Sequence, residues 1–215
     1  MTYIIGASGQ AKETAIYVLD CGIDSEVVFV DIEKNKDFIA IRNFECPVIP
    51  ESDFLSKIRH AFPKPDVVIA IGEPTVRARI VEKYIGFCDF PNVIHPSAEF
   101  LGKVKLGRGN IIAPMAFISV DCGFGDFNLI NYGATIGHDC LLGSYNSIYP
   151  QSIISGNVQI GDCNLLGAGC AIMENVSIGN NNIIGMSGVC LNSIGHYGKY
   201  VGVPLKKIEN IPYLL

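Results

Sequence analysis

The chain has 215 residues, 16 of them basic and 21 acidic, which gives a formal net charge of −5. This mild acidity excludes the dense positive surface that binds nucleic acid or anionic membranes, and no apolar run approaches the roughly 18 residues of a membrane span. The start, MTYIIGASGQ, lacks the basic and cleavage segments of a signal peptide. The eight cysteines form no C-x-x-C pair, so we expect reduced thiols and a cytoplasmic protein rather than a zinc or redox motif.

The first thirty residues have the order strand, glycine-rich turn, helix, strand and acid. Residues 3–5 are apolar, the turn Gly6-Ala7-Ser8-Gly9 follows, and apolar residues between positions 15 and 19 have helical spacing. Residues 27–30 are a β-rich run that ends in Asp31. This order is typical of the opening of a Rossmann-like unit.

The glycine-rich turn allows two interpretations. In the first it cradles a phosphate, because Gly6 and Gly9 let the backbone approach closely and the amides after Ser8 point outward from the helix N-terminus. Asp31 would then bind a ribose or a base. In the second, the turn only joins strand to helix and Asp31 is a cap, since GASG departs from the pattern G-x-G-x-x-G.

The segment after residue 65 continues the same pattern. Residues 66–72, DVVIAIG, predict a further buried parallel strand. Pro74 suits the first turn of a helix over residues 74–84. Residues 86–93 are expected to link this first part to the second.

The second part is dominated by a repeat of six residues. From Ile94 to Ile184, every sixth residue is Ile, Leu or Phe, and Gly often follows it. A period of six fits neither a helix nor simple strand alternation, but it fits short strands joined by tight turns around a prism. The large side chain would fill the interior, while a small or polar one packs beside it.

Both halves together resemble bacterial sugar acetyltransferases of the sialic acid O-acetyltransferase type, which include nucleotide-aminosugar N-acetyltransferases of surface glycan biosynthesis. The resemblance implies a Rossmann-like α/β domain over residues 1–88, which binds the nucleotide sugar. It also implies a left-handed parallel β-helix of hexapeptide repeats over residues 89–215, which carries out acetyl transfer. The segments that carry the resemblance are YIIGASGQAKE, VVFVD, VVIAIG, NVIHPSA, INYGATIGHDCLLG, SGNVQIG and YVGVPLKK.

The resemblance also implies a catalytic site. His138, in the sequence ATIGHDC, matches the family's base, and imidazole can take a proton from the acceptor and return it to a leaving thiolate. Asp139 would orient the ring or be an ordinary turn acid. Gly156 would give the backbone amide that stabilises the oxyanion. No covalent enzyme intermediate is required, because the acceptor attacks acetyl-CoA directly.

The binding residues follow from the same resemblance. For the acceptor they are Gly6, Ser8, Gly9, Gln10, Asp31 and Gly72. For acetyl-CoA they are Ser147, Ala168, Met186 and Lys206, with Lys207 beside the last, although a solvated basic tail is an equal alternative. Related proteins often have His at the positions of Gln10 and Ser147, which leaves the acceptor open. No metal is expected.

Other functional classes share parts of this sequence pattern. A zinc carbonic anhydrase on the same prism needs three clustered histidines, but His95, His138 and His196 are scattered over the coils. An NAD-dependent oxidoreductase is disfavoured by the incomplete fingerprint. A non-catalytic scaffold, and O-acetylation of sialic acid or another sugar, stay open as alternatives to N-acetylation. The few charges between residues 109 and 190 predict an interface, and we expect a homotrimer with active sites between neighbouring prisms.

Overall fold

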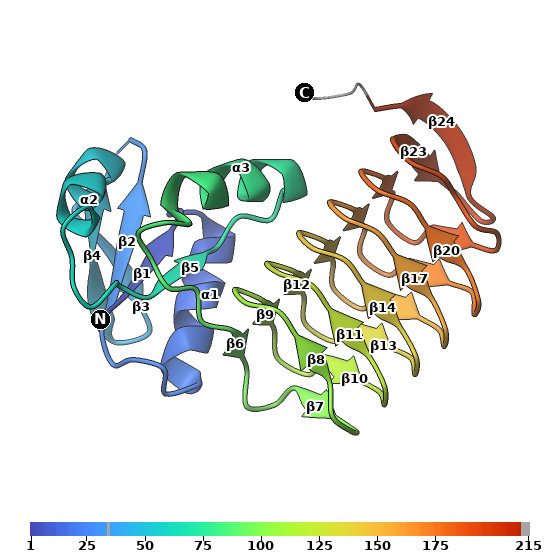
Figure 1. Ribbon diagram of the computed structural model, residues 1–215, viewed down its shortest axis with the longest axis horizontal. Helices are drawn as coiled ribbons and strands as arrows, with labels where there is room; N and C mark the ends of the chain where they lie inside the picture. The colour runs from blue at the N-terminus through green and yellow to red at the C-terminus, as the bar shows by residue number, and fades with distance from the viewer. Residues whose placement is uncertain (34, 212–215) are drawn as a thin grey trace.

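The computed structural model describes residues 1–33 and 35–211. It has an α/β part at the N-terminal end and a prism of short strands beside it (Figure 1). This is the predicted fold class, a Rossmann-like part followed by a left-handed parallel β-helix.

The N-terminal part is one sheet with helices on both faces. Its strand order is β3-β4-β2-β1-β5, in which β1 is parallel to β2 and β5, and β3 is antiparallel to β4. The predicted strands and the helix from Pro74 are present, whereas the β3–β4 hairpin and α2 were not predicted. The strands are β1 (Thr2–Ile5), β2 (Val27–Asp31), β3 (Phe38–Ile41), β4 (Phe44–Pro50) and β5 (Val67–Ile69). The helices are α1 (Gly9–Asp20), α2 (Glu51–Ile58) and α3 (Pro74–Tyr84).

The prism is built from two-residue strands that recur every six residues, so the predicted period continues without an insertion from β6 to β22. From β6 to β19, each strand pairs in parallel with the strand 18 residues later. Face I holds β6 (Val93–Ile94), β9 (Ile111–Ile112), β12 (Leu129–Ile130), β15 (Ser147–Ile148), β18 (Leu165–Leu166) and β21 (Ile183–Ile184). Face II holds β7 (Glu99–Phe100), β10 (Phe117–Ile118), β13 (Thr135–Ile136), β16 (Ile153–Ile154), β19 (Ala171–Ile172) and β22 (Val189–Cys190). Face III holds β8 (Lys105–Leu106), β11 (Gly123–Phe124), β14 (Leu141–Leu142), β17 (Gln159–Ile160) and β20 (Ser177–Ile178).

The prism interior explains the repeat. The residues at the six-residue markers stack into one apolar core, and most of them are fully buried. At the corner between faces III and I, a column of buried asparagines runs along the prism. Each Asn Oδ1 accepts the backbone N–H of the asparagine one coil further along, at 2.9 Å for the pairs 110–128, 128–146, 146–164 and 164–182. Each asparagine side chain thereby provides a partner for the backbone N–H of the next coil, which the tight corner would otherwise bury without a hydrogen bond.

The last coil is shorter than the others. Ile178 pairs with Ile194, only 16 residues later. Strand β23 (Gly198–Val201) then extends face I and pairs antiparallel with β24 (Lys206–Asn210). The antiparallel pair therefore ends the parallel stack at the C-terminal end of the prism, as Figure 1 shows.

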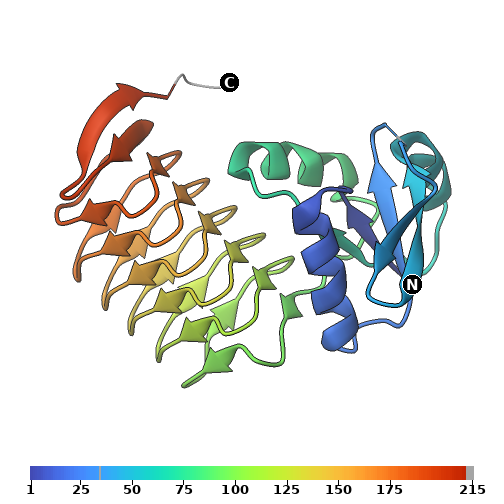
Figure 2. The ribbon, with the colours of Figure 1, turned by 180° about the vertical axis from the view of Figure 1, so that it is seen from behind.

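The two parts share a core. Helix α1 packs on the first coils of face I (Figure 2), where Val93, Ile111 and Leu129 are buried in the same cluster as Ala15 and Val18. The expected linker, residues 86–93, is packed against the rest of the protein. Cys88 and Phe90 are buried, and the backbone of Asp89 forms an isolated parallel β-bridge with Asp66. The N-terminal part is therefore held against the prism on a continuous apolar surface.

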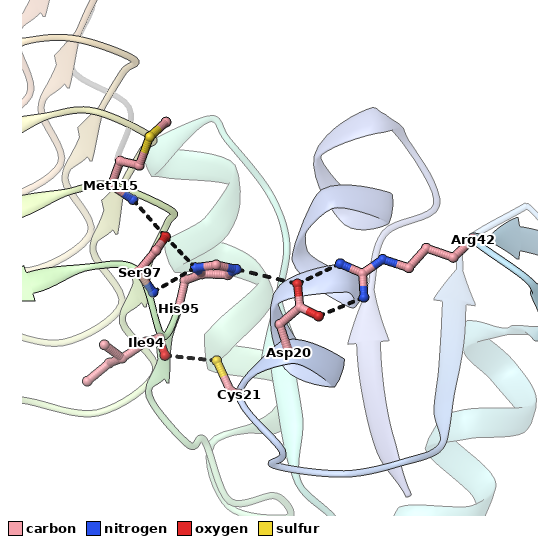
Figure 3. A network of polar contacts seen from close by, with 7 residues as sticks. All are labelled: Asp20, Cys21, Arg42, Ile94, His95, Ser97 and Met115. Atoms are coloured by element: carbon pink, nitrogen blue, oxygen red, sulfur yellow. Dashed lines mark hydrogen bonds and ion pairs between the residues drawn. The ribbon is translucent and has the colours of Figure 1, made fainter.

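A polar network reinforces this contact at the end of α1 (Figure 3). Arg42 donates to both carboxylate oxygens of Asp20, each at 2.7 Å, and His95 Nε2 lies 3.4 Å from Asp20 Oδ2. The Ser97 amide donates to His95 Nδ1 at 3.1 Å, so Nε2 carries the ring proton and donates to Asp20. Two hydrogen bonds extend the network, from Cys21 Sγ to the Ile94 carbonyl and from the Met115 amide to Ser97 Oγ.

Candidate active site

His138 lies at the corner between faces II and III, in the turn from β13 to β14. Its Nδ1 is 2.7 Å from Oδ2 of Asp139, which occupies the left-handed region with φ of +58°. Because the carboxylate can only accept, Nδ1 carries the proton, and the lone pair of the neutral ring is on Nε2. Both side chains are more than half exposed, at 62% and 58%. The ring is therefore oriented by its neighbour and open to a reactant.

Gly156 lies next to the ring, one coil further along the same corner. A Cβ atom at this position would come within 2.6 Å of both Cε1 and Nε2 of His138. Any larger residue would push the imidazole from its place. The structure therefore brings His138, Asp139 and Gly156 together in one small area.

One other corner of the prism has a ladder of hydrogen bonds donated by its backbone amides, and the His138 corner lacks it. At the corner between faces III and I, a side chain of each following coil accepts the corner amide, as Asp126 does from Arg108 and Asp162 from Ser144. The His138 corner has no such ladder, and among the described residues the Gly156 amide donates no hydrogen bond. An unbonded amide beside a histidine is what stabilisation of an oxyanion requires.

The predicted acceptor residues gather at the carboxyl ends of β1, β2 and β5. The Gly6 amide donates to the Val30 carbonyl at 2.9 Å, and a Cβ on Gly6 would lie 3.2 Å from Ile71 Cδ1. Gly6 has a φ of +111°, a conformation that L side chains rarely adopt. In open α/β sheets, ligands bind at this edge, outside the carboxyl ends of the strands.

The N-terminus of α1 faces the same edge. Ser8 is the N-cap residue, but its side chain makes no capping hydrogen bond, and a Cβ on Gly9 would meet nothing within 4 Å. The first amides of the helix are thus available to an anionic group. Gln10 turns back toward its own helix, with Nε2 3.4 Å from Thr14 Oγ1.

A small cleft adjoins Asp31. It has a volume of about 190 Å³ and is lined by Ala7, Asp31, Asn35, Lys36, Ile39 and Val48. The wall on one side is the β3–β4 hairpin, which sequence reasoning missed. Asp31 Oδ1 accepts the Ile32 amide at 2.8 Å.

The residues predicted to bind acetyl-CoA do not form one surface. Ser147 does not fit a CoA contact, because its side chain is fully buried and its hydroxyl donates to the Gly72 carbonyl at 2.6 Å. Ala168 and Met186 lie one coil apart at the corner between faces I and II, and Met186 is 75% exposed. Lys206 lies on β24 beyond them. Within one chain, face II therefore separates Ala168 and Met186 from His138, which lies at the corner between faces II and III.

Sequence reasoning missed Arg77, a buried residue of α3 that contacts Gly72 and Ser147. A signal existed, because Arg77 falls in the spacing of Pro74, Val81 and Tyr84, which form the buried stripe of the helix. Among the described residues, no group of three His, Cys, Asp or Glu could hold a metal ion. Within the same residues, no helix has the length and hydropathy to cross a membrane.

Comparison with known proteins identifies the family. The model of the PglD N-terminal domain family matches residues 2–84. PerB from Caulobacter crescentus, solved in complex with CoA and GDP-perosamine, is 30% identical over 97% of both chains, with a TM-score of 0.87. The chain belongs to the bacterial sugar acetyltransferases of the hexapeptide-repeat superfamily.

Other structures of the sugar acetyltransferase family agree. A mutant of perosamine N-acetyltransferase from Caulobacter crescentus, with CoA and GDP-perosamine, is 29% identical over 97% of both chains, with a TM-score of 0.87. The acetyltransferase domain of PglB from Neisseria gonorrhoeae, in complex with acetyl coenzyme A, is 26% identical, covers 96% of this chain and 98% of its own, and has a TM-score of 0.85. No curated protein matches the sequence. The protein is an acyltransferase of this family.

Proposed function

We propose that the protein transfers the acetyl group of acetyl-CoA to the amino group of a nucleotide-linked 4-amino-6-deoxysugar. The observation that carries the proposal is the His138 ring, held by Asp139 at 2.7 Å beside the unbonded Gly156 amide. The relatives crystallised with CoA and GDP-perosamine support this acceptor class. The family resemblance in the segments GASGQ and ATIGHDC points to the same reaction.

The reaction uses a direct attack. The amine nitrogen attacks the thioester carbonyl carbon while Nε2 of His138 takes the amine proton. The negative charge that develops on the carbonyl oxygen is stabilised by the Gly156 amide. When the C–S bond breaks, the protonated imidazole gives its proton to the CoA thiolate. Asp139 holds Nδ1–H throughout, so that Nε2 remains the reactive atom.

The acceptor nucleotide is assigned to the N-terminal part, residues 1–88. The N-terminus of α1 would bind the diphosphate, with Gly6, Ser8, Gly9 and Gln10 around it. The cleft beside Asp31 would take the base or the ribose. Gly72 contributes backbone at the same edge rather than a side chain.

A second copy of the chain would complete the site, and we propose a homotrimer. His138 is widely exposed, and exposed apolar side chains stand on both faces that meet at its corner, Ile153 on β16 and Leu141 on β14, which are 52% and 55% exposed. A proton-transfer site needs walls that exclude water, and a neighbouring prism on this corner would supply them. Acetyl-CoA would then lie between two prisms, where Ala168, Met186 and Lys206 of one copy can face His138 of the next. The eight free thiols fit a reducing cytoplasm.

The test is a panel of UDP-, dTDP- and GDP-linked 4-amino-6-deoxysugars plus sialic acid, each with acetyl-CoA and a free-thiol readout. We expect release of one thiol per amine acetylated with one of the nucleotide-linked aminosugars. Turnover of sialic acid alone would replace this proposal by O-acetylation. Absence of turnover with every acceptor would leave only a nucleotide-binding scaffold.

A further inference from the structure

Arg77 is the most deeply buried charged side chain of α3, with 2% of its surface exposed. Its Nε donates to the Phe127 carbonyl at 2.9 Å, and its two terminal nitrogens donate to the carbonyls of Ile71 at 2.6 Å, Tyr145 at 2.9 Å and Asn146 at 2.9 Å. Together with the bond to Ser147 Oγ at 3.0 Å, all five N–H groups of the guanidinium are directed at oxygens.

The partners of Arg77 come from both parts of the molecule. Ile71 and Gly72 follow β5 and belong to the edge where the acceptor residues gather, and the added Cβ on Gly6 would touch Ile71. On the prism side, Arg77 also donates to Ser147 Oγ at 3.0 Å, and the Ser147 hydroxyl donates to Gly72. One side chain thus links the acceptor edge to the prism.

The prism partners bracket one coil. Phe127 and Tyr145 are 18 residues apart and lie one above the other at the corner between faces III and I. The residues between them make one full circuit of the prism, and His138 lies in that circuit. Arg77 therefore holds the beginning and the end of the coil that carries the catalytic histidine.

Burying the charge of Arg77 among neutral oxygens costs free energy, which a purely structural role would not require. All the oxygens that Arg77 contacts are neutral, and burial lowers the pKa of Arg77 to about 10, so that the side chain stays charged at neutral pH. A buried cation often stabilises a fold no better than an apolar residue of similar size. What an apolar residue cannot supply is a rigid fork of directional hydrogen bonds.

We propose that Arg77 is a positioning residue, which fixes the acceptor edge of the N-terminal part relative to the coil that carries His138. The expected effect of Arg77 on turnover rests on the proposed function. With this fork removed, both ligands still bind, but the amine no longer reaches the thioester in the reactive geometry. A misplacement of about 1 Å is enough to lower the rate roughly 100-fold.

The test compares Arg77→Met and Arg77→Lys with Arg79→Met, a matched control that removes the same charge from an exposed position of the same helix. For Arg77→Met we expect kcat per folded site to fall about 10- to 100-fold. Calorimetry should give dissociation constants for CoA and for the free nucleoside diphosphate of the best acceptor within about twofold of wild type. Arg77→Lys should recover part of kcat, because it restores the charge but not the fork.

Two outcomes contradict the proposal. One is a kcat of Arg77→Met equal to that of Arg79→Met. The other is a loss of activity that is fully explained by a smaller number of ligand-binding sites in calorimetry, so that kcat per folded site is unchanged. Should Arg77→Met not fold, Ser147→Ala removes one prism partner of the fork and must lower kcat with unchanged ligand binding. Should wild type acetylate no acceptor, the proposed function fails by itself. Hydrogen exchange then tests the contact alone, since Arg77→Met must speed amide exchange in α3 and in the segments around Phe127 and Tyr145, whereas Arg79→Met must not.

Discussion

The imidazole of His138 lies against Gly156 so closely that a methyl group at position 156 would come within 2.6 Å of the ring. The two residues are 18 positions apart, which places them one above the other at the same corner. This relationship couples the base to the amide proposed to stabilise the oxyanion. It also explains why the corner has a glycine at this position, although Gly156 does not have a left-handed backbone.

Gly156→Ala should therefore displace the ring without disturbing the prism. We expect kcat to fall about 100-fold, because a misplaced base and a shifted oxyanion donor each act on the transition state. The matched control is Gly102→Ala, three coils earlier at the same corner, where an added Cβ would meet only Val120 at 3.2 Å. Equal turnover of the two variants, measured by thiol release, would show that the corner is not the active site.

His138→Ala should lower kcat by about 10²- to 10⁴-fold, the usual cost of losing a general base. The loss should lie in kcat rather than KM, because the ligand contacts remain. Asp139→Asn should lower kcat less. The asparagine can still form a hydrogen bond with Nδ1, but because its side chain can donate as well as accept, it no longer fixes the proton on Nδ1. The measurement is steady-state kinetics of both variants, and a larger loss in Asp139→Asn than in His138→Ala would reverse the assigned roles.

Much of this arrangement could be predicted from the sequence because it depends on local or periodic signals. The markers from Ile94 to Ile184 report the prism directly, since each fills the same interior position of a coil. Pro74 begins α3 as expected, because its ring favours the first helical turn. The GASG turn likewise precedes a helix that begins at Gly9.

The parts that were missed depend on tertiary contacts or on weak local signals. The β3–β4 hairpin turns at Arg42, which has a φ of +51°, without the glycine that usually marks such a turn. Ser147 was assigned to CoA through the family resemblance, but α3 covers face I at that point, and the Ser147 hydroxyl accepts from Arg77 and donates to the Gly72 carbonyl. The partners of Arg77 are mostly backbone carbonyls, which no residue type in the sequence announces.

Gly9→Ala tests the nucleotide site on the N-terminal part. The added methyl group meets no protein atom within 4 Å, and alanine favours the helix, so thermal stability should be unchanged or higher. A ligand diphosphate at the N-terminus of α1 would meet that methyl group, and we expect the KM for the acceptor to rise about tenfold, equivalent to about 1.4 kcal/mol. Gly86→Ala, also in open space, is the control. An unchanged KM in Gly9→Ala would place the nucleotide elsewhere.

The Asp20 network should make part of the stability depend on pH. The hydrogen bond from Arg42 holds the pKa of the Asp20 carboxyl below its ordinary value of 3.8, with a smaller contribution from His95. Because the folded pKa is depressed, this stabilisation is present above the unfolded value and is lost as the pH falls through the folded one. Arg42→Ala should thus lower the unfolding temperature at pH 6 but not at pH 2. A difference that persists at pH 2 would mean that Arg42 stabilises the protein by packing alone.

The most direct test of the account is to identify the product of the reaction and its dependence on His138. Wild type and His138→Ala are each incubated with ¹³C-acetyl-CoA and the nucleotide-linked aminosugar selected by the panel, and the product is examined by NMR. We expect an acetamide on the sugar nitrogen with wild type and almost none with His138→Ala, although calorimetry still shows both ligands bound to the variant. An acetyl ester on a hydroxyl, or equal acetamide formation by the two proteins, would contradict it.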